Sequence, residues 1–105
     1  MLGELEQVVM LALLRVGPEA YGVPVRDEIQ RCTGRDLTLG TVYKTLTRLE
    51  DKGFVGSWTG APTPQRGGRR KKHYKATGAG RVAVRQSLES LRTLTAGLDV
   101  GLKAP

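Results

Sequence analysis

The sequence predicts a mainly α-helical domain with one small β-hairpin. Apolar residues recur at helical spacing in three segments before residue 53 and in one after residue 77. Between them, two short strand-like runs flank a loop rich in glycine and proline. The 105 residues fit one domain, and 39% hydrophobic against 26% charged residues allow a core and exclude a disordered or collagenous chain.

The first predicted helix covers about residues 5–16 and ends at Gly17-Pro18. Almost its whole circumference is apolar, which requires burial on more than one side. Because a domain of this size has too little protein to cover such a helix, we expect part of its surface to contact a second subunit.

The second predicted helix runs from Val23 to about Cys32, with Pro24 in its first turn and Gly34 as the terminating residue. A short strand is expected to follow at residues 36–37.

Thr38 is expected to cap a third helix that runs to about Lys52 and ends at Gly53. Its core stripe is predicted to consist of Leu39, Val42, Leu46 and Leu49. The outer face is expected to be free of acids and to carry Thr41, Lys44, Thr45 and Arg48. Tyr43 flanks the core stripe, and it is equally well read as a core residue with a surface hydroxyl or as a phosphate ligand.

Residues 54–59 and 71–76 are predicted to pair as an antiparallel hairpin around an exposed loop at residues 60–70, with Trp58 packed on the hairpin. Thr77 can cap a last helix that runs through about Ala96, followed by a frayed tail at residues 99–105. The apolar seam of this helix, suited to a partner helix, consists of Val84, Leu88, Leu91 and Leu98.

Positive charge is concentrated in one region of the chain. The formal net charge is +7, yet residues 1–50 hold six Lys and Arg against seven acids, whereas residues 51–80 hold seven bases and one acid. A local basic excess favours a polyanionic partner, because neutralising phosphates releases condensed counterions.

Three helices, a basic hairpin and a further helix are the layout of a winged helix-turn-helix. The third helix is slim enough for a major groove, where its cations can reach phosphates or guanine edges, and the arginines of the loop can enter a narrow minor groove. The predicted DNA-binding residues are Thr38, Thr41, Tyr43, Lys44, Thr45, Arg48, Arg66, Gly67, Gly68, Arg69, Arg70 and Lys72.

Other classes of function find less support. The chain has no nucleophile–base pair, metal cluster or phosphate loop, so we expect no catalytic residue, metal or cofactor. The single cysteine, Cys32, is interpreted as a small apolar filler, and a chain without disulfides suits a reducing cytoplasm. Residues 8–14 are too short to span a bilayer, and the acids before them are unlike a secretion signal, which predicts a cytoplasmic protein.

Four segments together resemble the PadR-like regulators, in order and spacing: LGELEQVVMLALL, AYGVPVRDEI, LGTVYKTLTRLEDKGFV and RGGRRKKHYKATGAG. The resemblance covers roughly residues 2–94, and the single helix after the wing is similar to the shorter subgroup of the family. The final helix lacks the aromatic residue with which some relatives stack planar ligands, which argues against binding of aromatic drugs.

The resemblance implies a winged helix at residues 1–76 and a dimerisation helix at residues 77–98. It also implies a homodimer, built by the first and last helices, that acts mostly as a transcriptional repressor released by a small molecule. The expected dimer and effector surface is formed by Leu5, Val8, Val9, Ala12, Val84, Leu88 and Leu91.

Two alternatives remain open. The first is a winged-helix protein-interaction module whose basic hairpin only keeps it soluble. The second is RNA binding, which is less favoured because the hairpin lacks the interleaved aromatic residues that stack unpaired bases.

Overall fold

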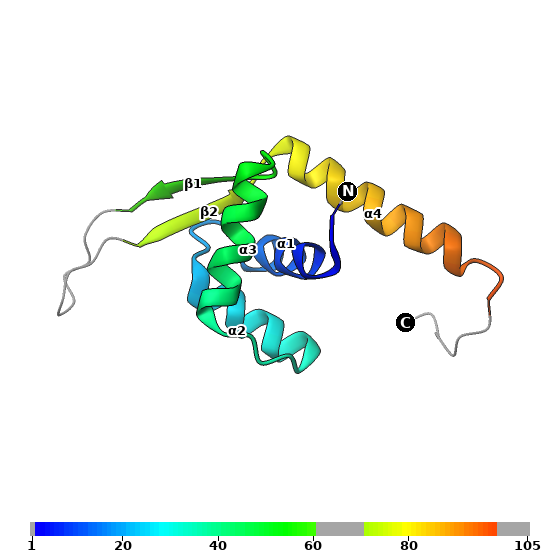
Figure 1. The fold of residues 1–105 in the computed structure, drawn as a ribbon, viewed down its shortest axis with the longest axis horizontal. Coiled ribbons are helices and arrows are strands. Elements are labelled where there is room, and N and C mark those ends of the chain that lie inside the picture. The colour runs from blue at the N-terminus through cyan, green and yellow to red at the C-terminus, as the bar shows by residue number, and fades with distance from the viewer. Residues whose placement is uncertain (1, 61–70, 99–105) are drawn as a thin grey trace.

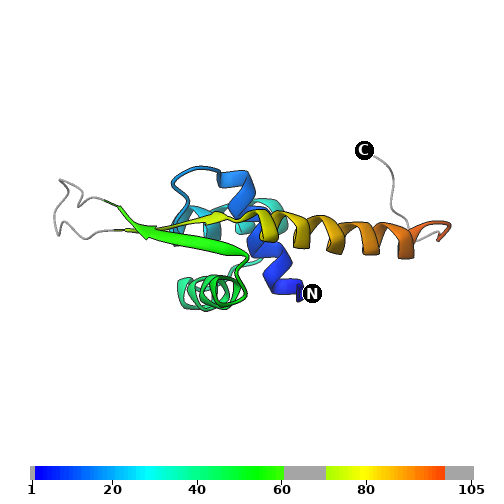
Figure 2. The same ribbon diagram turned by 90° about the horizontal axis from the view of Figure 1, so that it is seen from above.

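The computed structural model describes residues 2–60 and 71–98, which form four helices and one two-stranded antiparallel sheet. Helices α1 to α3 form a cluster, and the hairpin and α4 extend from it in opposite directions (Figures 1 and 2), over a length of 54 Å. This arrangement confirms the predicted mainly α fold with one hairpin. The elements are α1 (Glu4–Val16), α2 (Gly22–Thr33), α3 (Leu39–Asp51), β1 (Val55–Thr59), β2 (Lys72–Ala76) and α4 (Gly78–Thr95).

The helix ends follow local sequence signals. Gly34 ends α2 in the left-handed conformation, with φ of 74°, and its N–H bonds the carbonyl of Gln30. The hydroxyl of Thr38 accepts the N–H of Thr41 at the start of α3, and Thr77 caps α4 in the same way through Gly80. These predicted ends are confirmed.

The strand predicted at residues 36–37 is wrong, because this segment is an irregular connection between α2 and α3. A strand needs an edge with which to pair. The segment between α1 and α2 contacts the edge of β2 instead, where Tyr74 N–H donates to the carbonyl of Ala20 over 2.8 Å.

Helix α1 lies at the centre of the core and packs against α2, α3, α4 and β2. Tyr74 is the largest fully buried side chain, and burial raises the pKa of its hydroxyl, which stays protonated at neutral pH. The other apolar core residues are mostly aliphatic, as expected for a chain with few aromatics: Leu2, Val9, Met10, Ala12, Leu13, Ala20, Val25, Ile29, Val42, Leu46, Leu49, Val55 and Val84.

Helix α4 belongs to the core only in its first half. Gly80, Val84 and Ser87 are buried, whereas every residue from 88 to 98 is exposed. The first turn approaches the end of α3 so closely that a Cβ on Gly80 would lie 2.0 Å from the carbonyl oxygen of Phe54. Glycine has a low helix propensity, but at position 80 it is required because no larger residue fits against Phe54.

Cys32 is exposed near the end of α2, and its sulfur lies 3.6 Å from Glu28 Oε2 and 3.3 Å from Arg31 Nη2. The prediction that it fills an apolar gap is therefore wrong, because α2 turns this side toward solvent. None of the helices in the described part of the chain is both long enough and apolar enough to cross a membrane.

Candidate nucleic-acid interface

The exposed face of α3 carries cations. Lys44 and Arg48 are exposed, and neither takes part in an ion pair among the described residues. One helical turn earlier, the hydroxyl of Thr41 accepts a hydrogen bond from that of Thr38 over 2.9 Å, so both lie at the capped N-terminus. Cations on an open helix face that form no ion pair suit contact with phosphate or with base edges.

Thr45 does not lie on this face, and that prediction is wrong. Its side chain is 2% exposed, and its hydroxyl donates to the carbonyl of Thr41 over 2.8 Å. Thr47 is exposed instead, and it completes the outer face together with Gly40 and Lys44. The sequence did not predict Thr47 because the apolar stripe gives the rotation of a helix about its axis only to within about one residue. An error of this size exchanges residues at the border between the buried and exposed faces.

The outer face is also not free of acids, because Asp51 is exposed in the last turn of α3. It lies about two turns after Lys44, toward the C-terminal end. Lys44 and Arg48 therefore lie on the N-terminal side of this acid, and the exposed Lys52 follows it.

Tyr43 is a packing residue between α2 and α3. Its ring covers Gly22, where a Cβ would lie 2.4 Å from the ring atom Cζ, and its centroid is 6.4 Å from that of Tyr74. Of the two interpretations left open by the sequence, these contacts favour the core residue.

The hairpin presents one face to α3. In the observed register Ser57 pairs with Tyr74 and Thr59 with Lys72, so these side chains point the same way. The Ser57 hydroxyl donates to Glu50 of α3, and Lys72 Nζ lies 3.5 Å from the same carboxylate. The bond from Ser57, followed by the nearby ammonium of Lys72, lowers the pKa of Glu50 below its ordinary value.

Lys72, one of the predicted DNA-binding residues, is thus exposed on the α3 side of the hairpin, where Glu50 partly neutralises its charge. The predicted contacts in the wing loop, Arg66, Gly67, Gly68, Arg69 and Arg70, lie outside the described residues.

The opposite face of the hairpin holds an aromatic cluster. Trp58 stacks on His73 with ring centroids 5.4 Å apart, as expected of a residue packed on the hairpin. His73 Nδ1 lies 2.8 Å from the carbonyl oxygen of Glu19, and Tyr21 meets the His73 ring edge-on. Lys71 Nζ lies 4.4 Å above the ring of Tyr21, so the start of β2 is anchored to the start of α2.

The predicted dimer surface is only partly available. Val9, Ala12 and Val84 are buried within the chain, so the prediction that they face a partner is wrong. Their surfaces are covered by the contacts of α1 and α4 with each other and with the rest of the core. Leu5 and Val8 are half-buried, and Leu88 and Leu91 are 42% and 50% exposed.

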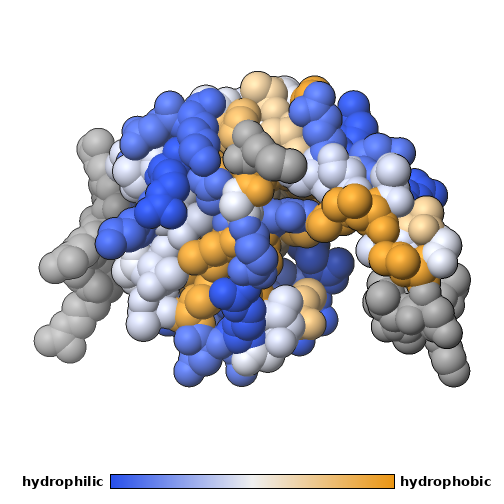
Figure 3. All heavy atoms as spheres, turned by 45° about the vertical axis from the view of Figure 1, so that its right-hand side comes forward, coloured by the Kyte–Doolittle hydropathy of each residue, from blue (hydrophilic) through white to orange (hydrophobic). Residues whose placement is uncertain are grey.

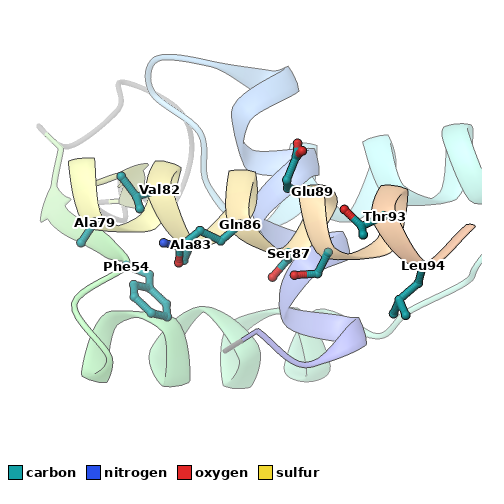
Figure 4. Close-up of a pocket in the computed structure, with 10 residues that line it drawn as sticks. Phe54, Ala79, Val82, Ala83, Gln86, Ser87, Glu89, Thr93 and Leu94 are labelled. Atoms are coloured by element: carbon teal, nitrogen blue, oxygen red, sulfur yellow. The ribbon is translucent and has the colours of Figure 1, made fainter. Parts of the chain in front are cut away.

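A groove of about 980 Å³ runs along another side of α4, beginning at Phe54 (Figure 4). Figure 3 shows apolar surface along α4 and a hollow between this helix and the rest of the molecule. The groove is lined by Phe54, Ala79, Val82, Ala83, Gln86, Ser87, Glu89, Ser90, Thr93 and Leu94.

Known structures share this fold. A PadR family transcription regulator from Clostridium difficile superposes with a TM-score of 0.73 at 22% identity, over 89% of this chain and 92% of that one. A PadR family regulator from Eggerthella lenta gives a TM-score of 0.69 at 26% identity, over 90% and 82% of the two chains. A PadR-like regulator from Bacillus cereus gives 0.71 at 17% identity, over 96% and 93%.

No match was found among curated protein sequences. The family model described as "Transcriptional regulator PadR-like family" matches residues 10–86, which include α2, α3, the hairpin and the first half of α4. Since this match covers well over half of the chain, the protein belongs to the PadR-like family of transcriptional regulators.

Proposed function

We propose that this chain is a homodimeric repressor that binds an inverted repeat in duplex DNA and is released by a small apolar molecule. The observation that carries the proposal is the position of Lys44 and Arg48 on the open face of a capped helix, free of ion pairs within residues 2–60 and 71–98. Lys72 lies on the side of the hairpin that faces the same helix. Two surfaces on one side of the molecule can then contact adjacent grooves.

In the proposed complex α3 enters the major groove with Thr38, Thr41, Lys44, Thr47 and Arg48. The wing reaches the flanking minor groove, where the arginines of the loop sequence (Arg66, Arg69 and Arg70) meet the strongest negative potential. Gly67 and Gly68 allow close approach of the backbone to DNA.

The dimer is proposed because α4 extends beyond the core and exposes apolar side chains. Leu88, Leu91, Leu94 and Leu98 are each at least 42% exposed, and exposed apolar side chains gathered on one element mark an interaction surface. A second copy related by a twofold axis would bury these leucines against α1 and α4, beside Leu5 and Val8. Two copies of α3 would then stand about 34 Å apart, one turn of duplex.

The effector is proposed to enter between α1 and α4, where Leu5, Val8, Leu88 and Leu91 remain accessible, or the adjoining groove beside Phe54. A molecule that binds one spacing of the dimer better than another shifts the population away from the DNA-binding state. A mainly apolar lining favours an apolar ligand.

The test is selection of a duplex from a random library by the full-length protein, followed by fluorescence anisotropy titrations over a range of salt concentrations. We expect enrichment of an inverted repeat and a logarithmic salt slope of about −0.9 for each phosphate contacted. Lys44→Ala/Arg48→Ala should abolish the preference. A reporter gene carrying the selected site should be transcribed less when the protein is present.

The outcome that contradicts this proposal is binding to no duplex, or equal and salt-independent binding to all of them. A partner protein held by apolar contacts, as in the protein-interaction alternative, would show little salt dependence.

A further inference from the structure

Glu6 is a charged residue buried in the fold. Its side chain is 5% exposed, and among the described residues the other buried polar side chains, Thr45 and Ser87, are uncharged. The carboxylate accepts hydrogen bonds from Lys52 Nζ at 2.8 and 2.9 Å and from the N–H of Gly3 at 2.8 Å. A buried carboxylate is costly unless it is paired in this way.

The carboxylate is ionised at neutral pH. Burial by itself raises the pKa of Glu6, but the bonds from Lys52 and Gly3 and the nearby charge of Arg48 outweigh it, so the pKa lies below its ordinary value. The pair is thus a true ion pair, and its two residues are 46 positions apart in the sequence.

The pair joins the start of α1, which belongs to the proposed dimer surface, to the end of α3, the helix proposed to bind DNA. Glu6 lies in the first turn of α1, next to Leu5, and Lys52 is the C-cap residue of α3. Both helices also contribute apolar residues to the shared core, and apolar contacts are not directional. The Lys52 ammonium contacts both oxygens of one buried carboxylate, so it ties the C-terminal end of α3, a helix about 20 Å long, to the first turn of α1.

We propose that the Glu6–Lys52 pair is a positioning link that holds α3 at one angle to α1 and thereby sets the sequence preference of the bound duplex. The inference rests on the proposed DNA-binding function and adds a residue that determines specificity without touching DNA. A displacement of α1 at the dimer surface reaches α3 through the same pair. In some proteins a buried charged or polar group favours one arrangement of the fold over its neighbours more than it stabilises the fold.

The sign of the effect separates this role from plain electrostatics. Glu6→Gln removes a negative charge, which by itself strengthens binding of any duplex. A loss of positioning instead weakens binding to the preferred duplex alone. Glu4→Gln is the matched control, because Glu4 lies in the same turn but is exposed and pairs with Arg35 at the surface.

The experiment compares anisotropy titrations of a duplex selected by the wild-type protein and of a scrambled duplex of equal length. We expect Glu6→Gln to lower the ratio of the two affinities about tenfold, the effect of one lost base contact. Binding to the scrambled duplex should be unchanged or stronger. Glu4→Gln should leave the ratio unchanged, and Lys52→Arg, which keeps the ion pair, should retain it.

Lys52 is 40% exposed and could contact a phosphate directly. In that case Lys52→Met weakens both duplexes alike and reduces the salt slope by about one contact, which overturns the proposal. Equal strengthening of both duplexes by Glu6→Gln overturns it as well. If Glu6→Gln fails to fold, as judged by circular dichroism, Lys52→Met and Lys52→Arg carry the same comparison.

A measurement without DNA keeps this inference separate from the proposed function. Amide NMR shifts of Glu6→Gln should change along α3 from Lys52 through Lys44, whereas those of Glu4→Gln should change only near its partner Arg35 and the start of α3. Changes confined to the neighbourhood of residue 52 overturn the link even if the wild-type protein selects a duplex. If the wild-type protein selects none, the function fails while the shifts still report on the link.

Discussion

The ring of Tyr43 lies directly over Gly22, so that a methyl group at position 22 would be 2.4 Å from the ring atom Cζ. This contact joins α2 to α3, the two helices of the helix-turn-helix, at the point where α2 begins. Glycine is required here because of what packs on it, since its own backbone has an ordinary helical conformation.

We expect Gly22→Ala to lower the free energy of unfolding by about 1–3 kcal/mol, because the tyrosine must move to admit the methyl group. The measurement is urea denaturation. In a double-mutant cycle, Gly22→Ala should cost less when Tyr43 is replaced by valine. Additive costs would mean that the two residues do not meet.

A second pair of glycines separates packing from helix propensity. Gly80→Ala should cost about 3 kcal/mol, since its Cβ would meet the backbone carbonyl of Phe54, which cannot rotate away. Gly78, in the same turn, has nothing within 4 Å of its Cβ position. Gly78→Ala should therefore leave stability unchanged or raise it by up to about 1 kcal/mol. Equal effects of the two changes on thermal unfolding would count against the close approach of α4.

Lys44 and Thr45 are neighbours on α3, but we expect the first to affect DNA binding and the second to affect stability. Lys44→Ala should weaken binding of the selected duplex by about 1–3 kcal/mol if it reads a base edge, and relax the preference at that position. Thr45→Ala should leave duplex binding unchanged and instead lower stability by about 1 kcal/mol, through the lost hydroxyl and methyl contacts. If Thr45→Ala affected DNA binding more than folding, Thr45 would have to contact DNA and the prediction would be wrong.

Arg48 tests the distinction between base and phosphate contacts. If it reads a base, Arg48→Ala should weaken the selected duplex more than a scrambled one. An equal loss on every sequence, with the salt slope reduced by about one contact, would make it a phosphate contact.

Leu91 tests the proposed dimer surface on α4. Because Leu91 is 50% exposed in the single chain, burial of this remaining half by a partner should contribute about 1 kcal/mol for each copy. We expect Leu91→Ala to raise the dimer dissociation constant in sedimentation equilibrium with no change in secondary structure. Glu89→Ala, on the opposite side of the helix, is the control. A wild-type protein that is monomeric at micromolar concentration would rule the dimer out.

Glu28 predicts a dependence of stability on pH. Hydrogen bonds from Arg31 and then Arg15 lower the pKa of its carboxylate from 4.5 to about 2. The unfolded chain therefore binds this proton first, and the contribution to stability is present above pH 4.5 and lost as the pH falls toward 2. Melting temperatures of Glu28→Gln should fall less steeply over this range than those of the wild-type protein. Parallel curves would show that the carboxylate is not stabilised in the fold.

Local sequence determined the elements of this protein and most of their ends. Thr38 and Thr77 cap helices through their own hydroxyls, and Gly34 ends a helix because it adopts a positive φ. Strand-favouring runs on either side of a turn-rich loop specify a hairpin. These signals act over a few residues, so they can be read without knowing what lies across the fold. The order of the elements and the placement of Lys44 and Arg48 on an exposed face follow from the same patterns.

Only the tertiary structure decided which side chains remain available. The angle at which α3 packs buries Thr45, exposes Thr47 and turns Tyr43 onto Gly22. The contacts of α1 and α4 with the core bury Val9, Ala12 and Val84 and leave Leu88 and Leu91 exposed. The pairing of Glu6 with Lys52 and the need for glycine at position 80 depend on residues distant in the sequence. Such contacts depend on the angles at which the helices cross. Helical periodicity predicts which face of a helix is buried, but it does not predict which residues that face contacts.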